Sequence, residues 1–456
     1  MASVKPICNK NGTISYKITV SLGRDYEGKK VIKTTTFIPK SKNSDRALKE
    51  AEAYAAVYEK QVMDGEIPSS KNITFAQFVK IWKENWLPAK TPTVRENYED
   101  VLRVRVLPEI GGMKLTSIKA LHIDKILNAE KAEGKAPKTI RMTFTVINSV
   151  FRYALKKQYI TENPCLRCDD LPPITMKTGN DLSFFTPDQT NRFLKDALTR
   201  EYDVHIKGHQ RTLKKTGEKY DVPGYIEKRS IPFQWRVYFT MAIEGQLRRG
   251  EMCALTWRDV DFKNQIVSVT KAIANTKNGQ IVKEPKTKAG IRDIVLPPDC
   301  IALLKQWKKE QRALCTNLGS AWKGHRDMIE DGKTVDSFDD NTIFIQIDNG
   351  RQIHLSTPGH KFGEIIDLYN AVCDQEAKEC QDKAERMRIL SKKLPKIRLH
   401  DLRHTGATVL LSKNVPVETV ARRLGHSKAS VTWDIYGHAL PEDDKKASDV
   451  LGEMFG

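Results

Sequence analysis

The chain has 456 residues, which at roughly 150 residues per domain predicts about three domains, and 76 Lys and Arg against 57 Asp and Glu give it a formal net charge of +19. This excess favours a polyanionic partner, nucleic acid first and an anionic membrane surface second. The eight cysteines are scattered and the N-terminus lacks a signal-peptide core, which excludes a secreted protein. No apolar run approaches the ~20 residues that cross a bilayer, which excludes a membrane-spanning protein. We therefore predict a cytoplasmic protein.

The first unit, residues 1–68, reads as a small sheet with one helix. β-branched and aromatic residues predict strands over 14–20 and 31–37, and Ser44 and Asp45 offer N-caps to a helix from about Arg46 to Met63. Lys, Arg and Thr dominate one face of these strands. That face is either solvated or in contact with DNA, since a sheet can enter a groove, and we favour DNA.

Residues 72–167 predict an entirely helical unit. Capping-box patterns begin at Thr74 and at Thr93, and apolar residues at helical spacing indicate further helices that end near Gly134 and before Asn163. Six basic residues decorate the last of these helices and its approach: Lys135, Lys138, Arg141, Arg152, Lys156 and Lys157. A solvated face would look similar, but in a chain of this charge we expect phosphate contacts.

After a linker at 168–182, residues 183–456 form the largest unit. Apolar runs predict a helix over 235–243 and short strands near 266–269, 281–282 and 292–296. Polar stretches at about 200–232, 317–341 and 374–396 read as surface insertions or mobile loops of unassigned role. The fold class is therefore multidomain α+β, mainly helical.

Three basic signals lie in this last unit. In Gly245-Gln246-Leu247-Arg248 an apolar helix breaks and restarts near Glu251, so Arg248 would meet a phosphate beside backbone N–H groups. His400 and Arg403, three residues apart, share one face of a helix. The third signal is Leu-Gly-His at 424–426, with Tyr436 ten residues after His426.

The second signal also permits a metal site. His400 and His404 have the spacing of the zinc-protease helix, but Asp401 replaces its glutamate and Arg403 would place a cation beside the metal. Catalytic zinc needs three protein ligands, and no third ligand is evident nearby. We therefore disfavour zinc and expect no metal or other cofactor.

Five motifs follow one another in this unit: the Arg of GQLRRGE, the Lys of EPKTKAGIRDIVLP, and the segments HDLRH, LGH and YGH. In this order they resemble the tyrosine recombinase, or phage integrase, family. The resemblance implies a metal-independent strand transferase with a covalent 3′-phosphotyrosine intermediate. It assigns phosphate contacts to the arginines, phosphate contacts or proton transfer to the histidines, the general acid to the lysine and nucleophilic attack to Tyr436. The implied set is Arg248, Lys286, His400, Arg403, His426 and Tyr436. Lys288 is the alternative to Lys286, and Arg249 the less favoured neighbour of Arg248.

The resemblance extends to the other units. Residues 72–167 are similar to the SAM-like core-binding domain, and residues 1–68 to the three-stranded arm-type DNA-binding domain of phage and conjugative-transposon integrases. It implies that the protein binds duplex DNA at core and arm-type sites and forms a homotetramer on synapsis. It also implies that an excisionase or a host DNA-bending protein can be a partner. The expected function is integration and excision of a mobile element. The alternatives are a non-catalytic DNA-binding regulator and a type IB topoisomerase.

The C-terminal tail carries an apolar stripe within 447–455. This stripe either closes its own domain or, as the resemblance implies, docks on a neighbouring protomer.

Overall fold

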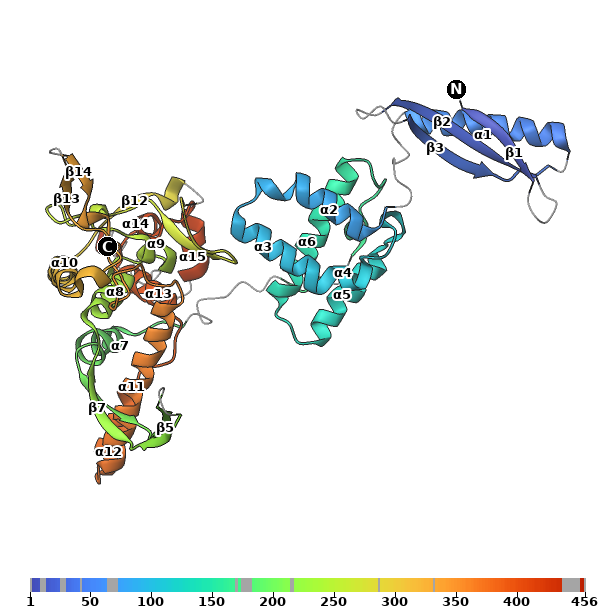
Figure 1. Ribbon diagram of the computed structural model, residues 1–456. Coiled ribbons are helices and arrows are strands. Elements are labelled where there is room, and N and C mark those ends of the chain that lie inside the picture. Colours follow the sequence, from blue (N-terminus) through green and yellow to red (C-terminus); the bar gives the residue numbers. More distant parts are fainter. Residues whose placement is uncertain are drawn as a thin grey trace. The chain divides into compact units, whose positions relative to one another are not determined.

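The computed structural model describes residues 2–8, 14–24, 30–41, 43–63, 73–168, 171–173, 183–213, 217–285, 288–330, 333–436 and 452–454. The chain divides into two compact units, Met1–Thr175 and Met176–Gly456 (Figure 1). Most of the predicted C-terminal tail helix lies outside the described residues, as does Lys286. None of the described helices combines the length and apolarity needed to span a bilayer.

The N-terminal part is an antiparallel meander covered on one face by a helix (Figure 1). Its elements are β1 (Ser3–Cys8), β2 (Ile14–Arg24), β3 (Lys30–Phe37) and α1 (Ser44–Met63). Alternation along β2 buries Ile18 and Val20 against Ala55 and Tyr58 of α1. The opposite face is polar, because Lys17 pairs with Thr36 across the strands. The two predicted strands and the helix are confirmed, and β1 completes the sheet.

Residues 73–168 are helical, as expected. The elements are α2 (Phe75–Asn85), η1 (Leu87–Ala89), α3 (Pro92–Val101), η2 (Leu102–Val106), α4 (Leu107–Ile110), η3 (Leu115–Ser117), α5 (Ala120–Ala132), α6 (Pro137–Lys156) and η4 (Pro164–Arg167). The capping box at Thr74 is confirmed by bonds in both directions with Gln77. The one predicted at Thr93 is wrong. Helix α3 already begins at Pro92, since proline at the first helical position has the backbone angle that a helix requires.

The second unit combines a large helical body with small sheets. The elements that precede the β10–β11 hairpin are α7 (Pro187–Arg192), η6 (Phe193–Ala197), β4 (Glu201–Ile206), β5 (His209–Thr212), β6 (Lys219–Val222), β7 (Tyr225–Ser230), α8 (Phe233–Glu244), α9 (Arg249–Ala254), η7 (Trp257–Asp259), β8 (Val260–Asp261) and β9 (Ile266–Val269). The hairpin itself and the later elements are β10 (Ala272–Thr276), β11 (Gly279–Lys283), η8 (Lys288–Gly290), β12 (Arg292–Val295), α10 (Pro298–Leu318), η9 (Gly319–Ala321), β13 (Met328–Glu330), β14 (Lys333–Asp336), η10 (Phe338–Asp340), α11 (Thr357–Glu379), α12 (Lys383–Ser391), α13 (Asp401–Ser412), α14 (Val417–Leu424) and α15 (Ala429–Tyr436).

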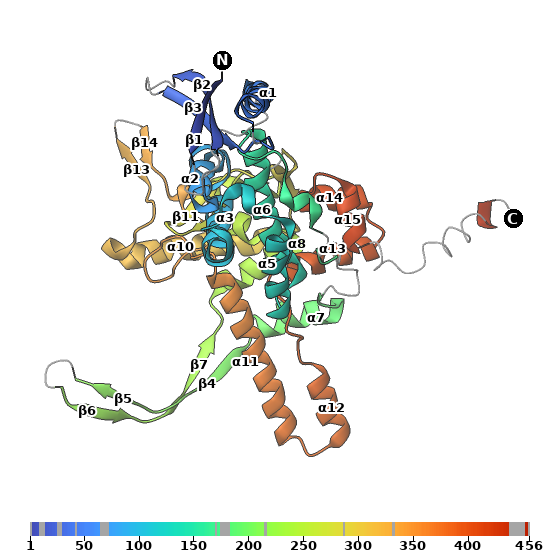
Figure 2. The same cartoon turned by 90° about the vertical axis from the view of Figure 1, so that its right-hand side faces the viewer.

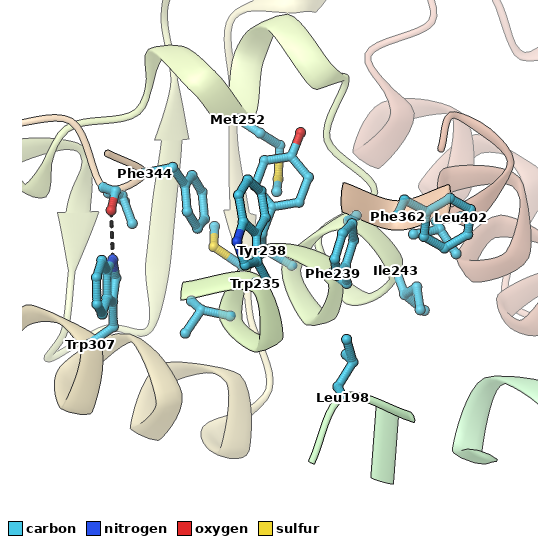
Figure 3. Packing of buried hydrophobic residues seen from close by; sticks show 14 of the residues in the cluster. Leu198, Trp235, Tyr238, Phe239, Ile243, Met252, Trp307, Phe344, Phe362 and Leu402 are labelled. Atoms are coloured by element: carbon cyan, nitrogen blue, oxygen red, sulfur yellow. Dashed lines mark hydrogen bonds between the residues drawn. The ribbon is translucent and has the colours of Figure 1, made fainter. Parts of the chain in front are cut away.

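Helix α8 is the centre of this unit. Nine of its twelve residues are buried, because neighbouring elements cover it on every side. Figure 3 shows Tyr238 beside Phe344 and Phe239 toward Phe362, with ring centroids 4.8 and 5.5 Å apart. At the edge of the same core the Trp307 indole donates to the Ile343 carbonyl oxygen at 2.6 Å. Such a core holds the ends of α8 rigidly, and the candidate site lies at its C-terminal end.

The three polar stretches are surface insertions that contain helices or strands where the structure describes them. Strands β4 and β7 form one two-stranded ribbon, β5 and β6 continue it, and β13 pairs with β14. The third stretch is the end of α11 and the whole of α12. Figure 2 shows the β5–β6 ribbon and the α11–α12 hairpin projecting from this unit. Backbone hydrogen bonds within each insertion satisfy its polar groups, and each insertion also adds buried residues to the core of this unit, among them Tyr202, Phe338 and Ile389.

Candidate active site

Arg248 stands at the turn where α8 gives way to α9. Gly245 ends α8, and Gln246 takes a positive φ of 55°. Arg248 is then the N-cap of α9: Glu251 Oε2 accepts from its backbone N–H at 2.9 Å, and Oε1 accepts from its Nη1 at 2.7 Å. This capping holds the guanidinium at the start of a helix, where it remains partly exposed. The predicted break and restart are therefore present, with α9 beginning at Arg249, two residues before Glu251.

Glu251 is a site residue that sequence reasoning missed. Its buried carboxylate lies between Arg248 and Arg292, and Arg292 Nη2 donates to Oε2 at 2.9 Å. Burial alone would raise the Glu251 pKa, but the two arginines, Arg292 first, outweigh burial and lower it. The carboxylate is therefore ionised and orients both guanidinium groups. A Glu three residues after an N-cap was the available sequence signal.

Arg403 lies on α13, which packs unusually close to α8. Gly406 makes this approach possible, because a Cβ there would lie 2.0 Å from the Ile243 carbonyl oxygen. The Arg403 guanidinium is 3% exposed and donates to the carbonyl oxygens of Gln246, at 2.5 Å, and of Leu424. Burial, and then the charge of Arg248, lower its pKa to about 9, so the side chain stays cationic at neutral pH.

Three arginines donate hydrogen bonds to backbone carbonyl groups at the C-terminal end of α14. Arg292 Nε donates to the carbonyl oxygen of residue 423 at 2.7 Å, Arg403 donates to that of Leu424, and Arg248 Nη2 donates to that of Gly425 at 3.2 Å. The last carbonyls of a helix have no helical partner and carry partial negative charge, so cations stabilise them. Gly425 turns the chain with a φ of 63° and thereby places His426 beside the arginines.

His426 and His400 border this cluster. His426 Nε2 lies 3.4 Å from Arg403 Nη2, and its Nδ1 lies 2.8 Å from the Thr432 hydroxyl oxygen. Burial and the charges of Arg403 and Arg248 lower the pKa of His426 to about 4. His400 is the N-cap of α13 and keeps an exposed edge, yet burial of the rest of the ring and Arg403 lower its pKa too. Both imidazoles are neutral at neutral pH.

Tyr436 ends α15 with its side chain 1% exposed. Its hydroxyl oxygen lies 2.5 Å from Nδ1 of His404, the residue next to Arg403. Burial raises the pKa of Tyr436, an effect that the Arg403 charge opposes. The phenol therefore belongs to the same cluster as the arginines and is un-ionised at neutral pH.

Two cavities open beside Arg248. One, of about 480 Å³, lies among α9, the β10–β11 hairpin and the turn after α14, and its lining includes Glu251, Lys283 and His426. The other, of about 700 Å³, is bordered by Arg249 and His400 as well. Tyr436 and Arg403 line neither of these two cavities. A further cavity of about 920 Å³ lies in the helical part of the first unit.

The structure brings five of the six predicted catalytic residues into one cluster of contacts or onto the walls of its cavities. The sixth, Lys286, lies between β11 and η8, outside the described residues, and the side chain of Lys288 is not described either. The cluster is rich in fixed positive charge, and each of the two cavities beside it is lined by at least one arginine and a histidine. It is suited to binding a compact anion such as a phosphodiester.

The predicted DNA contacts on α6 fall into two groups. Lys138, Arg152, Lys156 and Lys157 are exposed, whereas Lys135 pairs with Glu133 at 2.7 Å and Arg141 Nε donates to the Pro172 carbonyl oxygen at 2.6 Å. At 100° per residue, positions 138, 141, 152 and 156 fall within about 60° of arc. These four side chains form one basic stripe, which we call the α6 stripe.

The zinc alternative finds no support in these contacts. The part of the chain that the structure describes holds no group of three or more His, Cys, Asp or Glu side chains arranged for a metal ion. His404, one of the two histidines considered, directs Nδ1 to Tyr436.

Comparison with known proteins agrees with this geometry. The profile of the phage integrase family matches residues 222–443, and that of the phage integrase N-terminal SAM-like domain matches residues 74–130. The chain belongs to the phage integrase family. Its fold class, multidomain and mainly helical with small sheets, is also that of solved integrase structures.

Relatives of this integrase extend over its whole length. A protein named tyrosine recombinase XerC-like, from Caldanaerobacter subterraneus subsp. tengcongensis, is 26% identical and covers 98% of both chains. The ICEBs1 integrase of Bacillus subtilis is 23% identical over 89% of this chain and 90% of its own. A structure of the Tn1549 transposon integrase with transposon right end DNA has a TM-score of 0.57 at 19% identity, covering 84% of this chain and 100% of that one. At that identity it shows the shared fold.

Proposed function

We propose that this integrase is a site-specific DNA recombinase that cuts and rejoins strands through a covalent 3′-phosphotyrosine. The observation that carries the proposal is the cluster in which Arg403 contacts His426 at 3.4 Å, Arg248 contacts Gly425, and the Tyr436 hydroxyl lies within hydrogen-bond reach of the residue after Arg403. A phenol hydrogen-bonded to the residue after Arg403, in a cluster whose Arg248 lines two cavities, suits nucleophilic attack on a phosphodiester.

Each residue would have a distinct role. Arg248 and Arg403 would contact the non-bridging oxygens, exchanging their present carbonyl partners for the stronger phosphate interaction. His426 and His400, neutral at neutral pH, would hydrogen-bond the phosphate or transfer protons. Lys286, or alternatively Lys288, would protonate the departing 5′-oxygen. Because the arginines provide the positive charge, this scheme calls for no metal ion.

The bond balance of this scheme explains both cutting and rejoining. Attack by Tyr436 forms an oxygen–phosphorus bond and breaks the bond from phosphorus to the 5′-oxygen, which leaves as a hydroxyl. Because one phosphodiester replaces another, a 5′-hydroxyl from a second strand can reverse the attack without a nucleotide cofactor. That reversal is what strand exchange between two duplexes requires.

The remaining units would hold DNA. We propose an arm-type DNA-binding domain at 1–68, a core-binding domain at 72–167, a linker at 168–182 and a catalytic domain at 183–456. The α6 stripe supports the core-binding role. Relatives named ICEBs1 integrase and transposase from transposon Tn916, and a solved structure of the Tn1549 transposon integrase, support integration and excision of a mobile element as the biological task. We also propose a homotetramer on synapsis, as the family resemblance implies. An excisionase or a host DNA-bending protein stays a prediction.

The decisive experiment is a search for a covalent adduct. The full chain is incubated with duplexes that span the junctions of the element encoding it, and the products are resolved under denaturing conditions. We expect a protein–DNA adduct that Tyr436→Phe abolishes while duplex binding remains. Binding without an adduct would favour a regulator, and relaxation of plasmids that lack the junctions would favour a topoisomerase.

A further inference from the structure

The hydrogen-bond partner of the Tyr436 hydroxyl is His404, which the sequence interpretation considered only as a zinc ligand. The oxygen lies 2.5 Å from Nδ1, and the two ring centroids are 5.6 Å apart. The resemblance to recombinases implied proton transfer by His400 and His426 instead. In the described contacts, however, the phenol is hydrogen-bonded to His404, whereas His426 is hydrogen-bonded to Arg403 and Thr432.

The protonation states leave the phenol able to donate and the imidazole able to accept in this hydrogen bond. Burial raises the pKa of Tyr436, so its oxygen carries a hydrogen at neutral pH. Burial, and then the neighbouring His400, lower the pKa of His404 to about 4, so its ring is neutral. A neutral imidazole whose ring hydrogen is on Nε2 accepts the phenol hydrogen at Nδ1, and this is the tautomer in which His404 can act as a base toward Tyr436.

We propose that His404 takes the Tyr436 proton as the phenolic oxygen attacks phosphorus, an inference that rests on the function proposed above. The O–H bond breaks and its proton moves to Nδ1, the oxygen–phosphorus bond forms, and the bond to the 5′-oxygen breaks. In the rejoining step the imidazolium returns the proton to the phenolic oxygen. His404 is thus a catalytic residue, since it touches the reacting atom.

The surroundings of His404 couple proton transfer to phosphate binding. Arg398, Arg403 and the His400 ring, 5.2 Å away between centroids, disfavour the imidazolium, whereas buried Asp401 favours it. His426 is a further titratable group close to this ring. A phosphodiester bound at Arg403 would add a negative charge to this set and favour the imidazolium. Free phenolate is therefore not formed in advance, and the proton moves during attack.

The test replaces the base while keeping the hydrogen bond. His404→Asn retains an acceptor near the Nδ1 position but cannot take up a proton at neutral pH. On junction duplexes nicked so that cleavage is irreversible, we expect adduct formation to slow about 10²–10⁴-fold, the usual contribution of a general base, with duplex binding unchanged. His404→Gln repeats the measurement should the asparagine variant lose its cooperative unfolding transition. A rate within about threefold of wild type, in a folded variant, would overturn the proposal, since removal of a general base costs far more.

A second substrate separates attack from departure. In a 5′-bridging phosphorothiolate the leaving group is a thiolate, which departs without a general acid. We expect this substrate to restore Lys286→Ala, the matched control, and to leave His404→Asn slow. Repair of His404→Asn would place His404 on the leaving-group side and overturn the proposal. If wild-type protein forms no adduct on either substrate, the proposed function fails instead.

Discussion

Arg292 and Glu251 form an ion pair in which Nη2 and Oε2 lie 2.9 Å apart, although only 5% and 3% of their side chains are exposed. Glu251 also accepts from Arg248, and Arg292 also holds the end of α14. The pair therefore links the first candidate arginine to the turn that carries His426. Loss of this ion pair should therefore lower both the stability of the fold and the affinity of the site for phosphate.

Glu251→Gln should destabilise the catalytic unit by about 3–5 kcal/mol, because loss of one partner leaves a buried charge uncompensated. The free energy of unfolding from urea titration measures this effect. The control is Asp340→Asn, which removes the partner of Arg258 in an exposed pair and should cost less than about 1 kcal/mol. Equal losses in the two variants would contradict a structural role for the buried pair.

Gly406→Ala should destabilise the protein by about 1–3 kcal/mol or more, since the added carbon would lie 2.0 Å from the Ile243 carbonyl oxygen and would push α13 away from α8. Gly363→Ala, inside α11 with no atom within 4 Å of the added carbon, is the matched control. It should stabilise the protein by roughly 0.5–1 kcal/mol through helix propensity. Thermal unfolding of both variants gives the comparison, and similar shifts of the same sign would refute it.

The histidines of the site make stability depend on pH. In the folded protein the pKa values of His404 and His426 are about 4, well below the ordinary value for histidine. Between about pH 4 and 6.5 the unfolded chain binds more protons, so the free energy of unfolding falls as the pH is lowered through this window. We expect a loss on the order of 1–3 kcal/mol for each histidine.

Urea titrations at about pH 7.5, above this window, and at about pH 5, inside it, measure the part of the loss that develops between them. His426→Asn should reduce the pH dependence, whereas His354→Asn, a change at an exposed histidine outside the site, should leave it intact. The lowered pKa of Glu251 acts in a more acidic window, below its ordinary value of 4.5. A pH dependence unchanged by His426→Asn would show that the depressed histidine is not its source.

The α6 stripe predicts sequence-independent DNA contacts. Arg152→Ala should weaken duplex binding to a similar extent on every sequence and reduce the slope of log K against log salt by about one, the value for one phosphate contact. Lys125→Ala on α5 is the control, because Glu109 lies 3.7 Å from that lysine and partly neutralises it. Fluorescence anisotropy at several salt concentrations measures both slopes. An unchanged slope for Arg152→Ala would remove this residue from the DNA interface.

Local patterns in the sequence were sufficient for most elements. The capping box at Thr74, the helical spacing along α6 and the proline at the start of α7 involve residues within a turn or two of one another, so short-range preferences decide them. At Thr91 and Thr93 two starts compete within one turn, and the proline between them favours the earlier one. The order of the five basic motifs led to the family, because each motif is continuous in the chain.

Only the folded chain decided which side chains touch. Tyr436 meets His404 across 32 positions, Arg292 meets Glu251 across 41, and Arg403 meets the Gln246 carbonyl across 157. No periodicity or spacing encodes such pairs, since they depend on how closely α13 approaches α8 and where α14 ends. Sequence reasoning therefore identified the residue types that the chemistry needs, whereas tertiary packing made Glu251, Arg292 and His404 members of the site.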